Sequence, residues 1–592
     1  MTLPPSWCLP SNPTPLTPFA LKFLSHLDLP SIHPQCLTGS TKGVIPPHRS
    51  SFAYTSVLER LITLYFQAVP SLLAMAELWL RLFAFLVAPL CLSQLVYDEL
   101  TTMKTTPTTH DGGGRNRGGR VAISILGLLS CTALTTDVMY ITEYGIAYGG
   151  TLFALTALLT MRKVFRFRGV GRGRDQIALV VCTVACVLAI VSRVGGVRND
   201  DVPNIDPKLY YSSSNPVTSR LAETALREYA GGGAAYYDGP TGVATPWLIT
   251  GDARTGIPFL VNPLRDTVKY HRVYLPTFDD EAVALDICFP PADNDDDNDK
   301  PIYLVLHGLN GGSQEGFVLD FVETVCHRQN AVVVIMIARG LMDTPVFGDN
   351  VFHGARVDDV HYAATALREV ARRMNEKKGA VVAGVGYSMG AIVVANYVAR
   401  YGKDCALTAA VSVSGGLDMR ENLWFERGRK LWQPLLAVEL RSMILQKLGE
   451  KYERRLTREE MLEFLRATSI SRIDEYAVVT YNNYHSINHY YSEMSAMGDI
   501  PNHNPNTTSP RLSNVSIPLL VVHALDDPLC TWRTMGHPDT IVTSGEGYVM
   551  MLLTKTGGHV GWPVGWNPRG IGWGWMNDVA RDFVEGVVKL GN

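Results

Sequence analysis

The chain has 592 residues, which is too long for one ordinary domain. Its formal net charge of -3 gives no reason to expect a nucleic-acid partner. Charged residues make up only 18% of the chain, and the deficit lies mainly between residues 70 and 197, which indicates a membrane region.

The N-terminal segment, residues 1–70, is predicted to be mostly disordered. Its first 50 residues are rich in proline, serine and threonine, and they lack the apolar core of a signal peptide.

Residues 71–197 are predicted to form three or four transmembrane helices, because four apolar stretches approach the ~20 residues that a span needs. These stretches are residues 72–96, 121–141, 145–161 and 177–192. The first stretch could instead lie in the membrane interface. The alternative for the whole region is a buried helical bundle in a soluble domain.

Two basic segments, residues 115–120 and 162–174, are expected to face the cytoplasm by the positive-inside rule. The span over 177–192 would then place everything after it on the non-cytoplasmic side. Sequons at Asn506 and Asn514 agree with a lumenal location. We therefore expect an integral membrane protein of the endoplasmic reticulum or another endomembrane.

Residues 198–264 mix glycine, serine, aspartate and proline, and are predicted to be a linker. Residues 265–592 are predicted to be a separate domain, on the motifs described next. Within it, residues 379–385 are predicted to be a buried strand that leads into Gly-Tyr-Ser-Met-Gly at residues 386–390 and then a helix. A Gly-x-Ser-x-Gly turn between strand and helix is typical of the nucleophile elbow of an α/β-hydrolase fold, and it makes Ser388 the candidate nucleophile.

Three further pieces follow the pattern of that fold. A strand over 301–306 runs into the glycine-rich turn 307–312, where the fold carries its oxyanion loop. Downstream, a strand over 517–524 ends at Asp526 and Asp527, and a strand over 548–554 leads to His559. The chain order Ser, Asp, His is the order that this fold requires. Taken one at a time, each piece could be an ordinary loop residue.

The expected roles follow from triad chemistry. His559 would take the proton of Ser388, and a carboxylate would orient the imidazole. Asp527 is favoured over Asp526 because Pro-Leu-Cys follows it. The backbone N–H groups of Met389 and Leu309 are the candidate oxyanion donors. No metal and no cofactor are expected, since the chain has no His-Glu-x-x-His and no paired Cys/His spacing.

Residues 418–500 leave the strand pattern and are predicted to be a helical cap over the site. Residues 431–452 and 457–467 are predicted to be amphipathic helices, the second opened by a capping box at Thr457. The spacing of His353 and Asp358 could be an acyltransferase signature, but a turn followed by a helix-starting acid is the favoured interpretation.

Together these motifs resemble one branch of the α/β-hydrolases. They are His-Gly-Leu-x-Gly-Gly-Ser, Arg339-Gly340, His353-Gly-x-x-x-Asp358, Gly-Tyr-Ser-Met-Gly-Ala, Ala-Leu-Asp-Asp-Pro-Leu-Cys and Gly-Gly-His-Val-Gly-Trp. The branch contains YheT-type esterases, yeast medium-chain ethyl-ester synthases/esterases and mammalian membrane-anchored α/β-hydrolase-domain lipases. The resemblance covers about residues 265–590.

The resemblance implies a membrane-anchored serine esterase or lipase that takes an acyl-ester lipid as substrate. Two alternatives remain open from the sequence. One is an acyltransferase that passes the same acyl group to an alcohol, and the other is a non-catalytic membrane protein with a hydrolase fold. The chain departs from the branch at its N-terminal part, because many animal members carry one membrane anchor and several are expected here.

Overall fold

The computed structural model describes residues 18–27, 203–231, 233–239, 242–248, 250–261, 268–290, 300–374, 381–498, 511–568 and 572–591. The chain divides into two units, residues 1–40 with 200–592 and residues 41–199. The four predicted spans and both basic segments lie outside the described residues. Within the described ranges, no helix is both long enough and apolar enough to cross a membrane.

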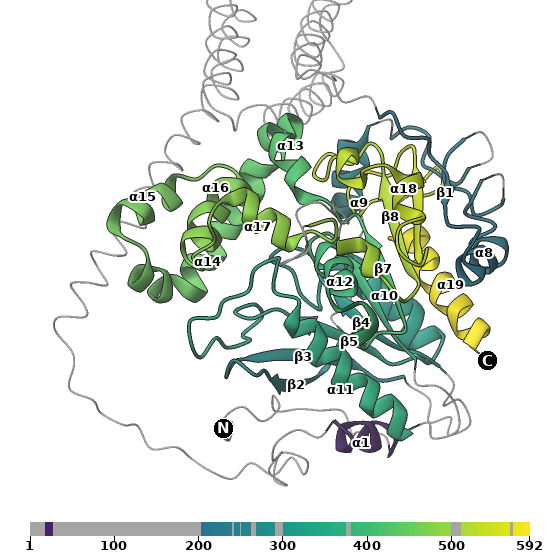
Figure 1. Ribbon diagram of the computed structural model, residues 1–592, viewed down its shortest axis with the longest axis horizontal. Coiled ribbons are helices and arrows are strands. Elements are labelled where there is room, and N and C mark those ends of the chain that lie inside the picture. Colours follow the sequence, from purple (N-terminus) through teal and green to yellow (C-terminus); the bar gives the residue numbers. More distant parts are fainter. Residues whose placement is uncertain are drawn as a thin grey trace, which may run out of the picture. The chain divides into compact units, whose positions relative to one another are not determined.

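Nine strands of the described residues form one mixed sheet, in the order β1-β9-β8-β7-β6-β4-β5-β3-β2 (Figure 1). The central strands are parallel, whereas β1, β2 and β3 pair antiparallel with their neighbours. The strands are β1 (Leu209–Tyr210), β2 (His271–Pro276), β3 (Ala282–Cys288), β4 (Ile302–Leu306), β5 (Val333–Ile337), β6 (Val382–Tyr387), β7 (Ala409–Val413), β8 (Leu519–Ala524) and β9 (Val549–Thr554). This order and the crossing connections are those of the predicted α/β-hydrolase fold.

The parallel strands are buried along their whole length and mostly apolar, because helices cover both faces of the sheet. In β4, Leu304 and Leu306 face one core cluster, while Tyr303 and Val305 face the other. Among the described residues, the α-helices outside the cap are α1 (Pro18–Ser25), α8 (Pro216–Glu223), α9 (Gly251–Val261), α10 (Gly316–Val322) with the π-helix η3 (Glu323–Arg328) after it, α11 (Asp358–Met374), α12 (Met389–Tyr401), α18 (Pro538–Val542) and α19 (Gly574–Gly591).

Helix α1 lies within residues 1–70, which the sequence predicts to be mostly disordered. Phe23, Leu24 and Leu27 of this short segment are buried in the same core cluster as residues of α11. Figure 1 shows α1 beside the end of α11, so residues 18–27 belong to the α/β unit.

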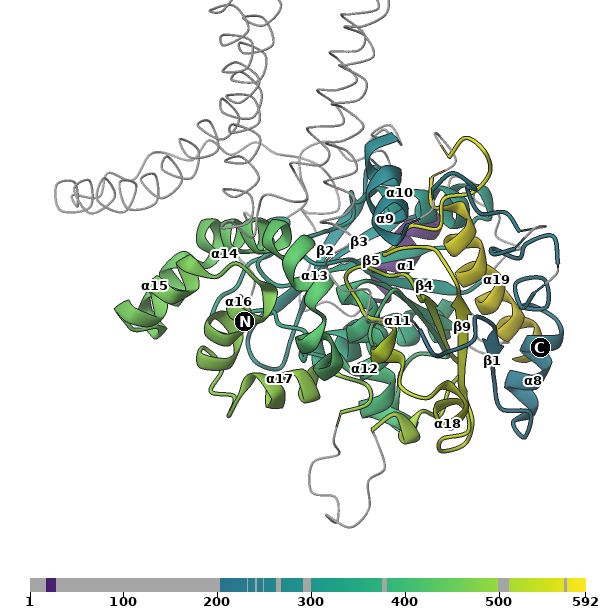
Figure 2. The ribbon, with the colours of Figure 1, turned by 90° about the horizontal axis from the view of Figure 1, so that it is seen from above.

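The described part of the predicted linker is likewise structured. Strand β1 pairs with β9, and Leu221 of α8 packs with the core residues of α19. Ala244 forms an isolated bridge with Val564. A composition rich in small polar residues indicated a linker, but these residues wrap the far edge of the sheet, and burial of a few apolar side chains is enough to hold them there (Figure 2).

The predicted cap corresponds to the helices that follow β7. They are α13 (Glu426–Leu431), α14 (Gln433–Arg455), α15 (Arg458–Arg466), α16 (Ile470–Asp474) and α17 (Ile487–Met494), with a π-helix η6 (Glu475–Thr480) between the last two. Thr457 caps α15 through the reciprocal bonds with Glu460 that the sequence predicts. Both ribbon views show these helices grouped on one side of the sheet (Figures 1 and 2).

Candidate active site

Ser388 stands between β6 and α12 in a conformation that few non-glycine residues adopt, with φ 54° and ψ -115°. Its two flanking glycines allow this turn. A Cβ on Gly386 would lie 2.3 Å from the carbonyl oxygen of Gly390, and a Cβ on Gly390 would lie 2.2 Å from that of Leu306. The elbow therefore presses against the end of β4, which brings the turn after β4 beside Ser388.

His559 joins the other two predicted triad members. Its Nε2 lies 2.8 Å from Ser388 Oγ, and its Nδ1 lies 2.8 Å from Asp527 Oδ2. The other carboxylate oxygen of Asp527 accepts backbone N–H bonds from Leu529 and Cys530, each of 2.8 Å. Three hydrogen bonds thus reach the carboxylate of Asp527, which is only 3% exposed.

Electrostatics keep that carboxylate charged. Burial alone would raise the pKa of Asp527, but the nearby His559 and the backbone donors outweigh it and hold the pKa below its usual value. An ionised Asp527 accepts from His559 Nδ1, which leaves Nε2 as the atom that faces the serine hydroxyl.

Asp526 is adjacent to Asp527 in the chain but makes different contacts. Its Oδ1 accepts the N–H of Gly558 at 2.9 Å, and its Oδ2 lies 3.3 Å from Arg254 Nη1. Burial raises the pKa of Asp526 to about 6. Asp526 therefore contacts the backbone beside His559, whereas Asp527 contacts its ring.

The loop that carries His559 is also held by α9, which lies in the segment predicted to be a linker. The N–H of His559 donates to Thr255 Oγ1 at 2.8 Å, and the next N–H, of Val560, donates to Ser414 Oγ at 2.9 Å. Val560 and Trp562 have φ of 48° and 45°, so the loop is strained and needs such anchors. No sequence signal identifies Thr255, because it lies about 300 residues from its partner.

The two candidate oxyanion donors lie in the turns that meet at the elbow. The N–H of Met389 is the first of α12 and has no acceptor within the helix. In the turn after β4, the N–H of Gly308 donates to Glu315 Oε2 at 3.1 Å, and Asn310 takes a left-handed φ of 57°. The next backbone N–H along that turn belongs to Leu309, the second oxyanion donor predicted from the sequence.

Glu315 is a residue that the motif analysis missed. Its carboxyl group lies under the turn, so close that a Cβ on Gly311 would lie 2.1 Å from its Cδ. Burial raises the pKa of Glu315 to about 8. The one available signal was an acidic residue immediately before an apolar helix, which more often marks a helix start.

Apolar side chains of the cap reach the elbow. Met389 packs on a cluster that includes Val478, Tyr490 and Met494 of the cap, and the N–H of Gly354 donates to Tyr490 Oη at 3.0 Å. Tyr491 Oη donates to Asp474, also in the cap, at 2.9 Å. Within the predicted aromatic run, Tyr490 therefore lies beside the elbow, whereas Tyr491 connects two parts of the cap.

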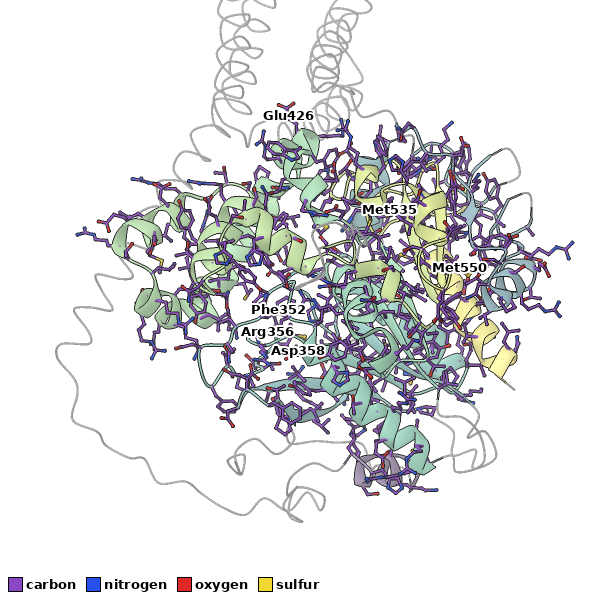
Figure 3. The ribbon with its side chains drawn as sticks, in the orientation of Figure 1. Phe352, Arg356, Asp358, Glu426, Met535 and Met550 are labelled. Atoms are coloured by element: carbon purple, nitrogen blue, oxygen red, sulfur yellow. The ribbon has the colours of Figure 1, made fainter. Side chains whose placement is uncertain are left out.

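His353 and Asp358 have separate surroundings, as a structural role predicts. His353 is buried edge-on to Tyr484 and Tyr490, and burial lowers its pKa to about 3. Asp358 is the first residue of α11 and accepts a 2.8 Å bond from Tyr401 Oη. Figure 3 labels Phe352, Arg356 and Asp358 on this segment, and Arg356 contacts Asp279 of the β2–β3 turn at 3.4 Å.

Comparison with known proteins gives relatives that are named as lipases, phospholipases or esterases. The chain is 26% identical over 273 residues to a monoacylglycerol lipase of Saccharomyces cerevisiae, covering 45% of this chain and 56% of the yeast protein. It is 26% identical over 360 residues to phospholipase ABHD3 of Homo sapiens, covering 59% and 79%. It is 27% identical over 267 residues to the putative esterase YheT of Escherichia coli, covering 44% and 70%.

The chain is related to this branch of the α/β-hydrolases. It spans 56% and 62% of the lengths of its yeast and Dictyostelium discoideum relatives. No protein-family model matches the chain. Among solved structures, a carboxyl esterase of Bacillus coagulans in complex with glycerol matches with a TM-score of 0.30 and 15% identity, covering 49% of this chain and 90% of that one.

Proposed function

We propose that the chain is a serine hydrolase that cleaves carboxylic esters of acyl lipids. The observation that carries the proposal is the pair of 2.8 Å contacts that His559 makes, one to Ser388 Oγ and one to Asp527 Oδ2. The relatives named above, a lipase, a phospholipase and a putative esterase, support ester hydrolysis.

In the proposed reaction, His559 Nε2 takes the hydroxyl proton as Ser388 Oγ attacks the ester carbonyl. Asp527 stabilises the imidazolium that forms. The N–H groups of Met389 and Leu309 bind the oxyanion, and each such donor is typically worth about 3 kcal/mol in the transition state. His559 then protonates the leaving alkoxide, and water, activated by the same histidine, releases the acid from the acyl-enzyme.

The proposed substrate class follows from the apolar cluster beside Met389. Val478, Tyr490 and Met494 bring cap side chains to the residue just after the nucleophile. An acyl chain bound there would be removed from water, which favours binding by about 0.8 kcal/mol for each buried CH₂. The names monoacylglycerol lipase and phospholipase among the relatives agree with an acyl-lipid ester.

We further propose that residues 71–197 attach the enzyme to a membrane and that the catalytic domain lies on the non-cytoplasmic side. The apolar stretches and the two basic segments of the sequence support this topology. Protease protection in sealed microsomes tests it. Digestion of the C-terminal domain from the cytoplasmic side, without a glycan at Asn506 or Asn514, would contradict the orientation and leave the catalytic proposal intact.

A fluorophosphonate probe tests the nucleophile directly, because it phosphonylates an activated serine. We expect labelling of the full-length chain, and none of Ser388→Ala or His559→Ala. Ser513→Ala is the matched control, since Ser513 lies in a short 3-10 helix away from the elbow. Undiminished labelling of Ser388→Ala would rule out the mechanism. Product analysis with and without an added alcohol then separates hydrolysis from acyl transfer.

A further inference from the structure

A second group of reactive side chains lies outside the candidate active site. Cys288 is the last residue of β3, and Cys326 and His327 are neighbours in the π-helix η3. The two sulfur atoms are 2.6 Å apart, and His327 Nε2 lies 3.5 Å from Cys288 Sγ. The two cysteines are 38 residues apart in the chain, so the spacing pattern that reveals metal or disulfide motifs is absent here.

A carboxylate orients the histidine of this group. Glu323 Oε2 lies 2.8 Å from His327 Nδ1, one helical turn away, which leaves Nε2 to face the sulfur of Cys288. The arrangement of carboxylate, imidazole and thiol is the one that turns a thiol into a thiolate. Short π-helical segments such as η3 are frequent at functional sites.

The protonation of the two thiols differs. The hydrogen bond that Cys326 donates lowers the pKa of Cys288, burial opposes it, and His327 adds to the lowering. The same hydrogen bond, together with burial, raises the pKa of Cys326. Cys288 is therefore the nucleophile of the pair and Cys326 its neighbouring thiol.

Access and spacing decide what this group binds or reacts with. Cys288 is 4% exposed and Cys326 is fully buried, whereas the side chain of His327, which contacts Cys288, is 37% exposed. Only a small reagent reaches the sulfurs. Two thiolates on one tetrahedral zinc ion, each about 2.3 Å from the metal, would lie roughly 3.7 Å apart. The observed separation is much shorter and favours a bond between the sulfurs.

We propose that Cys288 and Cys326 are an oxidation site at which hydrogen peroxide forms a disulfide between β3 and η3. The Cys288 thiolate attacks one peroxide oxygen, the O–O bond breaks, and the departing hydroxide takes the proton held by His327 and leaves as water. The sulfur of Cys326 then attacks the sulfenic acid of Cys288. Its thiol proton leaves with the second hydroxyl as water, so two thiols and one peroxide yield one disulfide and two waters.

Mass spectrometry of the reduced, full-length chain after brief treatment with hydrogen peroxide tests this. We expect a peptide cross-linked between Cys288 and Cys326, while the buried thiols of Cys405 and Cys530 remain alkylatable after unfolding. In Cys326→Ser, dimedone should trap a sulfenic acid at Cys288 instead. His327→Asn should slow cross-linking about tenfold while leaving the Glu323 contact possible.

Two results would overturn the proposal. One is that both cysteines of the peroxide-treated wild-type chain alkylate completely. The other is one equivalent of zinc in the untreated protein that is absent from both Cys288→Ser and Cys326→Ser, which would make the group a metal site. Neither result depends on ester hydrolysis, so the proposed function stands or falls separately.

Discussion

The serine side and the histidine side of the candidate site are held in place by different kinds of contact. On the serine side, five consecutive residues make the elbow, and backbone atoms of Gly390 and Leu306 leave no room for larger side chains. On the histidine side, side chains from distant parts of the chain hold the backbone: Thr255 bonds His559, and Asp526 bonds Gly558. One side is specified locally, and the other only once the chain has folded.

The two neighbouring aspartates give the largest expected contrast on the histidine side. Asp527→Asn should lower kcat by about 10⁴, because an amide favours the wrong tautomer of His559. Asp526→Asn keeps an oxygen for the N–H of Gly558 and loses only the charge that faces Arg254, so we expect a loss of tenfold or less. Steady-state hydrolysis of a short-chain nitrophenyl ester measures both variants. If Asp526→Asn were the inactive one, the assignment of the triad acid would be incorrect.

On the serine side, Gly390→Ala should lower kcat/KM at least 10²-fold. The new Cβ would lie 2.2 Å from the oxygen of Leu306, so the elbow must move away from the oxyanion turn. Gly449→Ala is the matched control, because nothing lies within 4 Å of a Cβ at that position of α14. It should keep full activity and raise stability by up to about 1 kcal/mol. Equal activity of the two variants would mean that the elbow tolerates the side chain.

The same contrast explains which features could be predicted from the sequence. The elbow, the strand ends at Asp527 and His559 and the capping box at Thr457 each occupy a few consecutive residues, and each has a recognisable pattern. The roles of Thr255 and Cys326 depend on contacts with residues far away in the chain. Composition also indicated a linker over 198–264, since short segments that wrap a sheet edge bury too few side chains to show a periodic pattern.

A smaller effect is expected where a distant side chain supports the histidine loop. Thr255→Val removes the acceptor of the His559 N–H and leaves that donor buried without its bond, at a cost of about 1–3 kcal/mol. Part of this cost should appear as a roughly tenfold lower kcat with little change in KM. Thr224→Val, which alters an exposed threonine within the same predicted linker 198–264, is the control. A normal kcat for Thr255→Val would mean that the loop of His559 keeps its conformation without the bond to Thr255.

Glu315, whose carboxyl group accepts the N–H of Gly308 in the turn after β4, is expected to affect stability more than turnover. Its pKa is raised to about 8 by burial, against an ordinary value of 4.5. Between these two values the folded chain keeps a proton that the unfolded chain has released. The free energy of unfolding therefore falls as pH rises from 4.5 to 8, by at most about 1.4 kcal/mol for each pH unit from this group.

Glu315→Gln removes this titration and keeps an oxygen for the N–H of Gly308. Relative to the wild-type chain, the variant should therefore gain stability as pH rises from 5 to 7.5, which urea unfolding followed by tryptophan fluorescence measures. Glu459→Gln, at the exposed start of α15, should show no such trend. A constant difference between Glu315→Gln and the wild-type chain would mean that Glu315 is already ionised in the folded protein. The turn that carries Leu309 would then rest on a charged carboxylate, and a negative charge beside a forming oxyanion would oppose the proposed reaction.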